Sequence, residues 1–204
     1  IISFKLTGNI NYLLDCETDR KEAYDNILQL NDNEIYMDLG AFNGDTVQEF
    51  LCNVSSYNKI YAVEPDAKNF AKLERNTADI RNIDRINACI SDFCGEVTFS
   101  KHGGRNGNAD EKGIPVKTAT VDSILGNKNV TYIKFDVEGL EKEAIDGAKE
   151  TINRCRPKML ISCYHRSEDI FEIPLQILNI RDDYKVFIRH NPYIPAWDTQ
   201  FYFI

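Results

Sequence analysis

The chain has 204 residues, a length that suits one globular domain with a full hydrophobic core and a short appendage. Its 24 lysines and arginines face 32 acidic residues, so the net charge is −8, and no basic run is present that would favour a nucleic-acid partner. No apolar run approaches the length needed to cross a bilayer, so no membrane partner is expected. The six cysteines form no Cys-x-x-Cys pair, which indicates a reducing, cytoplasmic setting.

The first 33 residues are expected to form a segment that caps the main domain, which would occupy residues 34–204. From Ile2 to Leu6, apolar residues alternate with polar ones, and this pattern predicts a short strand. Further along, Tyr24, Ile27 and Leu28 share one face of a predicted helix. Simple packing against the sheet is the expected role of this segment.

Residues 34–46 predict a strand, a tight glycine turn and the start of a helix. The strand ends near Asp38, and Gly40 and Gly44 let the backbone turn sharply and approach a ligand closely. Free amide groups at the start of the helix favour an electron-rich group. Such a unit is typical of a nucleotide-type binding domain. The alternative is a structural turn with an incidental Asp38.

A second apolar run, Lys59 to Val63, ends in Glu64, Pro65 and Asp66. Glu64 stands 26 residues after Asp38, close to the distance at which one strand-helix-strand unit delivers an acid to a ribose. A carboxylate suits that position because it accepts hydrogen bonds from both ribose hydroxyls. Asp66 is expected to cap the helix that follows.

A third apolar run, Ile86 to Ile90, ends in Ser91 and Asp92. Polar residues here would lie at the carboxyl edge of the sheet, where ligands of open α/β sheets bind. An ordinary turn is an equally good interpretation, since Asp92 and Gly95 are common turn residues.

Two further runs, at residues 96–100 and 114–121, alternate in polarity as paired or edge strands do. Residues 101–113 between them include four glycines among polar residues and predict a mobile loop. The loop would be either a lid over a substrate or solvent-exposed slack. It carries His102, the weakest of three histidine candidates for a catalytic base.

The second half of the chain alternates predicted strands and helices. Strands are expected at Tyr132 to Phe135, Met159 to Cys163, Tyr184 to Ile188 and Gln200 to Ile204, and helices at Glu141 to Ile152 and Ile170 to Ile180. No crossover helix separates the last two strands, so they should pair antiparallel. The sequence therefore predicts an α/β, Rossmann-like three-layer sandwich with a mostly parallel seven-stranded sheet and one antiparallel C-terminal strand. This arrangement departs from that of ordinary dehydrogenases.

Several motifs, spread in order over roughly residues 34 to 190, resemble those of FkbM-type methyltransferases of the class I, S-adenosylmethionine-dependent group. The motifs are Asp38-Leu39-Gly40-Ala41-Phe42-Asn43-Gly44-Asp45-Thr46, Glu64-Pro65-Asp66, Ser91-Asp92, Thr120-Val121-Asp122, Lys134-Phe135-Asp136-Val137-Glu138-Gly139, Gly147-Ala148 and Tyr164-His165. One departure is Phe42, where many methyltransferases carry glycine. Gly40 and Gly44 remain to form the turn.

The resemblance implies that residues 34–204 transfer a methyl group from S-adenosylmethionine to a small-molecule acceptor, usually to a hydroxyl oxygen of a sugar or a secondary metabolite, and release S-adenosylhomocysteine. In that family the first acid pairs with the ammonium group of the cofactor or orders water beside it, and the residue at Asp92 often meets the adenine. The implied cofactor-binding residues are Asp38, Gly40, Ala41, Asn43, Gly44, Thr46, Glu64, Pro65, Ser91, Asp92 and Asp136.

Methyl transfer to an alcohol requires donor and acceptor to be held in line, and the hydroxyl must lose a proton. His165 is the predicted general base, because a neutral imidazole accepts a proton near pH 7; a structural, hydrogen-bonded histidine is the alternative. Asp136 is expected to assist by orienting the acceptor or contacting the amino end of the cofactor. The predicted acceptor-binding residues are Glu138, His165 and, as the fallback base, His190.

No metal is expected, although Asp136 and Glu138 with waters could hold magnesium. Metal-dependent catechol-type methyltransferases carry an Asp-Asn pair where this chain has Tyr164-His165. Two other classes stay open. A nicotinamide-dependent oxidoreductase would use the same turn and Glu64, but it predicts a parallel last strand. A non-catalytic binding module with the same fold would have lost the cofactor residues that this chain retains.

Overall fold

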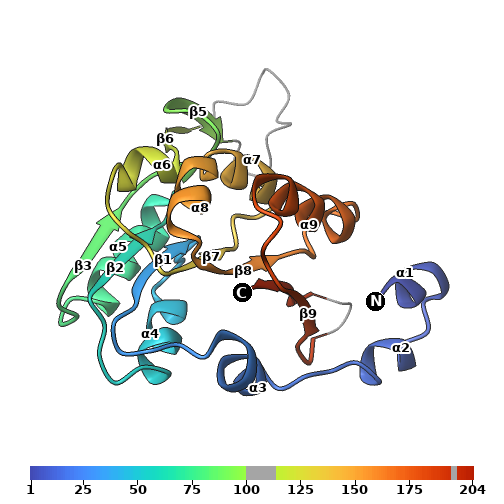
Figure 1. The fold of residues 1–204 in the computed structure, drawn as a ribbon. Helices are drawn as coiled ribbons and strands as arrows, with labels where there is room; N and C mark the ends of the chain where they lie inside the picture. The colour runs from blue at the N-terminus through green and yellow to red at the C-terminus, as the bar shows by residue number, and fades with distance from the viewer. Residues whose placement is uncertain (100–113, 194–196) are drawn as a thin grey trace.

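The computed structural model describes residues 1–99, 114–193 and 197–204. At its centre lies a seven-stranded sheet with the order β3-β2-β1-β7-β8-β10-β9 (Figure 1). Its strands are β1 (Ile35–Leu39), β2 (Lys59–Val63), β3 (Ile83–Ile86), β7 (Tyr132–Phe135), β8 (Lys158–Ser162), β9 (Val186–His190) and β10 (Thr199–Phe203). A smaller sheet, ordered β4-β6-β5, contains β4 (Cys89–Ile90), β5 (Gly95–Phe99) and β6 (Ile114–Ala119).

The direction of the strands in the large sheet matches the prediction from the sequence. Every neighbouring pair from β3 across to β8 is parallel, whereas β10 runs antiparallel to both β8 and β9. The antiparallel last strand is therefore confirmed. Because the other strands share one direction, the carboxyl ends of β1, β2, β7 and β8 meet at one edge of the sheet, where open α/β sheets bind their ligands.

Helices cover both faces of the large sheet and make three layers (Figure 1). One core forms between the sheet and α3 (Arg20–Ala23), α4 (Asp45–Cys52) and α5 (Ala67–Asn76). The other forms against α6 (Val121–Leu125), α7 (Glu141–Asp146), α8 (Lys149–Cys155) and α9 (Asp169–Ile180). Successive strand residues point to opposite faces, so Tyr36 belongs to the first core and Met37 to the second.

The prediction of a strand from Ile2 to Leu6 is wrong. These residues lie in α1 (Ile2–Thr7), which is followed by α2 (Asn11–Leu14). The backbone here satisfies its hydrogen bonds locally, as in the bond from Lys5 N to Ile1 O of 2.9 Å. Alternation over five residues does not separate a strand from a short helix, and without a neighbouring strand the local hydrogen bonds of a helix prevail.

The predicted helix that carries Tyr24, Ile27 and Leu28 is confirmed, with one difference. The α-helix α3 continues into a π-helical turn, η1 (Tyr24–Leu28), and the three apolar residues are buried against the sheet. The segment is also tied to the main domain by charge, because Arg20 forms ion pairs with Glu49 of α4 and with Asp198 before β10.

The third apolar run, predicted as one strand from Ile86 to Ile90, is divided between the two sheets. β3 ends at Ile86 in the large sheet, and β4 pairs with β6 in the small one. The division falls at Asn87, whose side-chain amide donates to the carbonyls of Glu64 (2.8 Å) and Pro65 (3.1 Å). These hydrogen bonds turn the chain, and a pattern of apolar residues does not reveal them. The predicted pairing of the next two runs is confirmed, since β5 and β6 are antiparallel.

The single helix predicted from Glu141 to Ile152 is two helices, α7 and α8, interrupted at Gly147. A Cβ atom at Gly147 would lie 2.2 Å from the carbonyl oxygen of Ser91, so the close approach of these two segments requires glycine. The predicted loop at residues 101–113, with His102, lies outside the described residues. Among the described residues, no helix combines the length and the apolar character that crossing a membrane requires.

Candidate active site

The glycine turn after β1 is confirmed, and it is held on both sides. Gly40 and Gly44 have φ of 85° and 91°, which lie in the left-handed region that favours glycine. The amides of Gly40 and Ala41 both donate to the carbonyl of Val63 at the end of β2. A Cβ at Gly40 would lie 1.9 Å from the carbonyl oxygen of Asp136 at the end of β7. The turn therefore joins the ends of three strands.

Two other residues of the turn complete its hydrogen bonds. Asn43 accepts from the backbone amide of Asp45 through its side chain (3.1 Å), and its carbonyl accepts from Asn76 of α5 (2.8 Å). Phe42 occupies the position where many methyltransferases carry glycine. Its φ of 46° lies in the left-handed region, which glycine adopts more readily than other residues. Asn43 has thus an evident structural role, and any contact with a cofactor would be in addition to it.

Glu64 lies at the end of β2, and backbone amides fix both of its carboxylate oxygens. Oε2 accepts from the amide of Phe42 (3.0 Å) and Oε1 from that of Asp66 (2.9 Å). The side chain is buried, and this burial raises the pKa of Glu64. Asp66 caps α5 as predicted, because its side chain accepts from the amides of Lys68 and Asn69. The glycine turn and the carboxylate after β2 form one unit.

Asp38 is fully buried beneath the turn. Thr46 donates its hydroxyl to Oδ2 of Asp38, and Nζ of Lys134 lies 3.6 Å from Oδ1. Burial raises the pKa of Asp38 against the opposing effect of Lys134. The side chain therefore anchors the start of α4 and the neighbouring strand. Thr46, also predicted as a cofactor residue, contacts Asp38 in this arrangement.

Lys134 is a buried cation between two acids, on the strand next to β1. Its ammonium lies 3.3 Å from Oδ2 of Asp136 and 3.6 Å from Asp38. Burial alone would raise the pKa of Asp136, but Lys134, His165 and Ser162 together outweigh this effect and the pKa is lowered. Tyr164 adds a hydrogen bond from its hydroxyl to Oδ1 of Asp136 (3.2 Å). Asp136 is thus held as a carboxylate and remains partly exposed.

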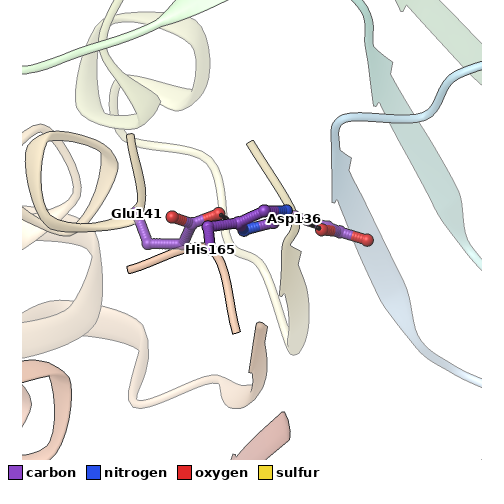
Figure 2. A group of neighbouring side chains, drawn as sticks. All are labelled: Asp136, Glu141 and His165. Atoms are coloured by element: carbon purple, nitrogen blue, oxygen red, sulfur yellow. Dashed lines mark ion pairs between the residues drawn. The ribbon is translucent and has the colours of Figure 1, made fainter. Parts of the chain in front are cut away.

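His165 lies between two carboxylates at the end of β8. Its Nδ1 is 2.9 Å from Oε1 of Glu141, and its Nε2 is 3.7 Å from Oδ1 of Asp136 (Figure 2). Nε2 also lies 3.5 Å from Oε2 of Glu138. Glu138 has φ of 55°, and its side chain is 89% exposed. Burial alone would lower the pKa of His165, but the three carboxylates, with Glu141 foremost, raise it. Predicted residues Asp136, Glu138 and His165 are thus brought together.

One ligand atom each of Asp136, Glu141 and His165 lies within 4.8 Å of the others, a spacing that would admit a metal ion. Existing contacts compete with such a role. Lys134 and Tyr164 contact the two oxygens of Asp136, and Oε1 of Glu141 accepts from the amide of Val137 (3.0 Å). A cation held here would also be repelled by the buried ammonium of Lys134, 3.3 Å from Oδ2 of Asp136, which disfavours this group as a metal centre.

The remaining predicted residues lie outside this cluster. Ser91 is buried and its hydroxyl donates to the exposed Asp92 (3.0 Å) at the start of the turn before β5. His190 is buried at the end of β9, with β10 between it and β8, and its Nδ1 lies 3.1 Å from Thr199 Oγ1. Burial lowers the pKa of His190. His165 is therefore better placed than His190 for contact with Asp136.

Sequence reasoning missed Lys134, Glu141 and the hydroxyl of Tyr164. Lys134 has a signal in the sequence, because a lysine inside an otherwise apolar strand needs an acidic partner. Glu141 reads as an ordinary acid in the first turn of a helix, and only the fold brings it to His165, 24 residues further along the chain. Its contact with His165 is the main addition that the structure makes to the predicted site.

The strand order β3-β2-β1-β7-β8-β10-β9, with one reversed strand, is that of class I methyltransferases, and the predicted fold is thereby confirmed. Residues 38–188 match the model of the methyltransferase FkbM domain. The chain belongs to this methyltransferase family.

Three known proteins illustrate the similarity. The chain is 24% identical to 2-O-methyltransferase NoeI of Sinorhizobium fredii over 72% of its length and 70% of that protein. The crystal structure of methyltransferase FkbM from Methylobacillus flagellatus KT matches with a TM-score of 0.84 and 27% identity, over 99% of this chain but only 52% of that one. This chain therefore spans about half the length of that protein. Fibrillarin from Aeropyrum pernix, crystallised with bound S-adenosyl-L-methionine, has a TM-score of 0.54 and 15% identity, over 85% of this chain and 67% of that one, and shows likeness of fold alone.

Proposed function

We propose that the protein transfers a methyl group from S-adenosylmethionine to a hydroxyl oxygen of a small molecule, with a carbohydrate as one expected acceptor class. Membership of a methyltransferase family supports the transfer, and the distant relative NoeI, a 2-O-methyltransferase, supports oxygen as the target. The S-adenosylmethionine bound to fibrillarin, which shares the fold, supports the cofactor.

The observation that carries the cofactor proposal is the position of Glu64. Its oxygens accept from the amides of Phe42 and Asp66, and a carboxylate oxygen can accept further hydrogen bonds. The carboxylate is thereby fixed beside the glycine turn, where it would accept hydrogen bonds from the two ribose hydroxyls. The cofactor would contact the backbone of the turn and of the next strand end, at Gly40, Ala41, Asn43, Gly44 and Pro65. Its adenine would lie near Ser91 and Asp92. The buried pair of Asp38 and Thr46 would hold the turn in place.

Asp136 would lie between the cofactor and the methyl acceptor. The methionine part of the cofactor carries an ammonium and a sulfonium, and the carboxylate at Asp136 is suited to face positive charge. Against the effect of burial, Lys134 and His165 lower the pKa of Asp136, so its carboxylate stays ionised near neutral pH. At the same time, its contact of 3.7 Å with Nε2 of His165 brings the cofactor end within reach of the acceptor end.

The acceptor proton is taken by Nε2 of His165. In an in-line displacement the acceptor oxygen forms a bond to the methyl carbon, the carbon–sulfur bond breaks, and its electron pair stays on the sulfur of S-adenosylhomocysteine. The hydroxyl proton passes to Nε2; among the described residues neither ring nitrogen of His165 makes a hydrogen bond of standard geometry. Displacement of the exposed Glu138 side chain opens Nε2 to the acceptor, and Glu138 then binds a second hydroxyl. His190 would contact only a more distant part of the acceptor.

The contacts of residues 1–33 with the last strands support a role for this segment as a cap on the main domain. Residues 1–33 act as a cap segment on a methyltransferase domain of residues 34–204. Thr18 N donates to His190 O (2.8 Å), and Arg189 pairs with Glu22 (3.2 Å). A reducing, cytoplasmic setting agrees with the free thiols of the described cysteines, and the negative charge argues against a nucleic-acid partner.

The test uses S-adenosylmethionine labelled in the methyl group, incubated with fractionated small molecules from the host. We expect label in a product whose new methyl is bonded to oxygen, with undiminished yield in the presence of a chelator. His165→Gln should retain S-adenosylhomocysteine binding and transfer label at least 100-fold more slowly, in the range that general bases contribute. Full transfer by His165→Gln, or label on nitrogen or carbon, would contradict the proposal.

A further inference from the structure

We infer that Glu141 is a positioning residue that fixes neutral His165 as the Nδ1–H tautomer and so leaves the lone pair of Nε2 for the acceptor hydroxyl. This inference rests on the proposed function of His165. The residues come from different elements, because Glu141 is the first residue of α7 and His165 follows β8. Figure 2 shows the imidazole between the carboxylates of Glu141 and Asp136.

The environment of Glu141 makes it a fixed acceptor. The side chain is 1% exposed, and Oε1 accepts from the amides of Val137 (3.0 Å) and Gly139 (3.4 Å). These amides belong to the turn after β7 that also carries Asp136 and Glu138. The carboxylate is thus held by backbone, and its orientation toward the imidazole does not depend on a mobile side chain.

The tautomer follows from this fixed acceptor. A carboxylate offers only lone pairs, so the negative charge on Oε1, 2.9 Å from Nδ1, favours a proton on this ring nitrogen, although the contact lacks the alignment of a standard hydrogen bond. A neutral imidazole has one N–H, and if Nδ1 carries it, Nε2 is the basic nitrogen. The same division of roles occurs wherever a buried acid orients a catalytic histidine. A Nε2–H ring would instead place two lone pairs 2.9 Å apart inside the protein.

The other charged groups near the imidazole of His165 lie on its Nε2 side. Asp136 and Glu138, which follow β7, lie near Nε2, and Lys134 lies behind Asp136. The ring of Tyr164 packs on His165, with ring centroids 4.2 Å apart. The guanidinium of Arg166 lies close to Gly139, since its Nε would be 3.5 Å from a Cβ atom added to that glycine. Asp136 and Glu138 favour a protonated Nε2, and Glu141 alone selects the proton on Nδ1. The two effects can therefore be separated by experiment.

Nuclear magnetic resonance of the imidazole nitrogens tests the inference without an acceptor. The chain has three histidines, and loss of one set of signals in His165→Gln assigns those of His165. Above the pKa of His165, the nitrogen shifts of the wild-type protein should show a protonated Nδ1 and an unprotonated Nε2. In Glu141→Gln, the amide oxygen keeps its hydrogen bonds from Val137 and Gly139 and still faces Nδ1, so the tautomer should be kept, and the pKa of His165 should fall below the wild-type value because the negative charge is lost.

The control is Glu150→Gln, which makes the same chemical change at an exposed position of α8 and should leave both readings unaltered. A wild-type ring with its proton on Nε2 would overturn the inference, and this measurement needs no variant to fold. An unchanged pKa of His165 in a folded Glu141→Gln would also overturn it. With an acceptor in hand, Glu141→Gln should lower kcat with little change in KM for S-adenosylmethionine, because Nε2 becomes a weaker base when the negative charge beside Nδ1 is lost.

The same samples distinguish this inference from the proposed function. Calorimetric titration with S-adenosylhomocysteine should give equal dissociation constants for wild type, Glu141→Gln and Glu150→Gln, because Glu141 contacts His165 and not the glycine turn. Absence of binding by the wild-type protein would contradict the proposed function whatever the tautomer. Normal binding together with the wrong tautomer would contradict the role of Glu141 alone.

Discussion

A Cβ atom placed on Gly40 would lie 1.9 Å from the carbonyl oxygen of Asp136. The glycine of the turn after β1 is therefore needed for contact with the end of β7, whatever ligand the turn also meets. This contact joins the side of the site assigned to the cofactor to the side assigned to the acceptor.

Gly40→Ala should lower the free energy of unfolding by about 3 kcal/mol or more. The residue has φ of 85°, which costs a non-glycine residue about 1–3 kcal/mol, and relief of the overlap with Asp136 adds a similar amount. Gly126→Ala is the control, since Gly126 also has positive φ but its Cβ would meet nothing within 4 Å. Its expected loss is about 1–2 kcal/mol. Equal losses in urea denaturation would show that the contact with Asp136 does not matter.

Lys134→Met should destabilise the fold by about 3–5 kcal/mol. The change removes the cation that lies beside the buried Asp38 and also breaks the ion pair between Lys134 and Asp136. Lys59→Met is the matched control, because Lys59 pairs with Asp84 at the surface of a strand and should contribute about 1 kcal/mol or less. Urea denaturation measures both. A Lys134→Met protein within 1 kcal/mol of wild type would be inconsistent with the buried network described here.

Much of this fold could be predicted from the sequence because short continuous apolar runs mark the strands that are buried on both faces of the sheet. The reversed β10 followed from one local fact, the lack of a helical pattern between the last two strands. The boundaries that failed depend on contacts between distant segments. The carbonyls of Glu64 and Pro65 turn the chain at Asn87, and the carbonyl of Ser91 requires Gly147. Neither contact leaves a pattern in the residues around it.

The site divides in the same way. Strand ends identify Asp38, Glu64, Asp136 and His165, because the carboxyl edge of a parallel sheet collects them. Which of them faces a ligand depends on burial, and Asp38 lies under the turn with Thr46 and Lys134 as its partners. The pairing of Glu141 with His165 depends on how α7 packs beside β8, which no local pattern encodes.

Glu64→Gln should weaken binding of S-adenosylhomocysteine about 10- to 100-fold. The amide replaces an oxygen that accepts from ribose and from backbone, and hydrogen bonds to charged groups contribute about 1.5–3 kcal/mol each. Asp66→Ala provides the comparison. It should lose about 1 kcal/mol of stability with its helix cap and leave the dissociation constant within about threefold. Titration calorimetry on both proteins checks the pair; an unchanged constant for Glu64→Gln would remove Glu64 from the cofactor site.

The two described histidines should affect stability with opposite pH dependence. The pKa of His165 is raised, so its contribution is fully present below its ordinary value of 6.5 and is lost as the pH rises through the raised pKa. The pKa of His190 is lowered, so His190 is neutral in both states above pH 6.5 and destabilises the fold as the pH falls below that value.

The comparison of single variants at several pH values tests this. Substitution of His165 by Gln should cost more stability at pH 6 than at pH 9, whereas His190→Gln should be relatively more stable at pH 5 than at pH 8. Denaturant unfolding at each pH gives the differences. A His165→Gln effect that does not change with pH would mean that Glu141 and Asp136 do not favour the protonated ring.

The central claim, that the glycine turn and Glu64 hold S-adenosylmethionine, is tested most directly by titrating the wild-type protein with S-adenosylhomocysteine and, separately, with NAD in a calorimeter. We predict one site for S-adenosylhomocysteine, with a micromolar dissociation constant, and no heat of binding for NAD. Binding of NAD in preference to S-adenosylhomocysteine, or binding of neither, would contradict it.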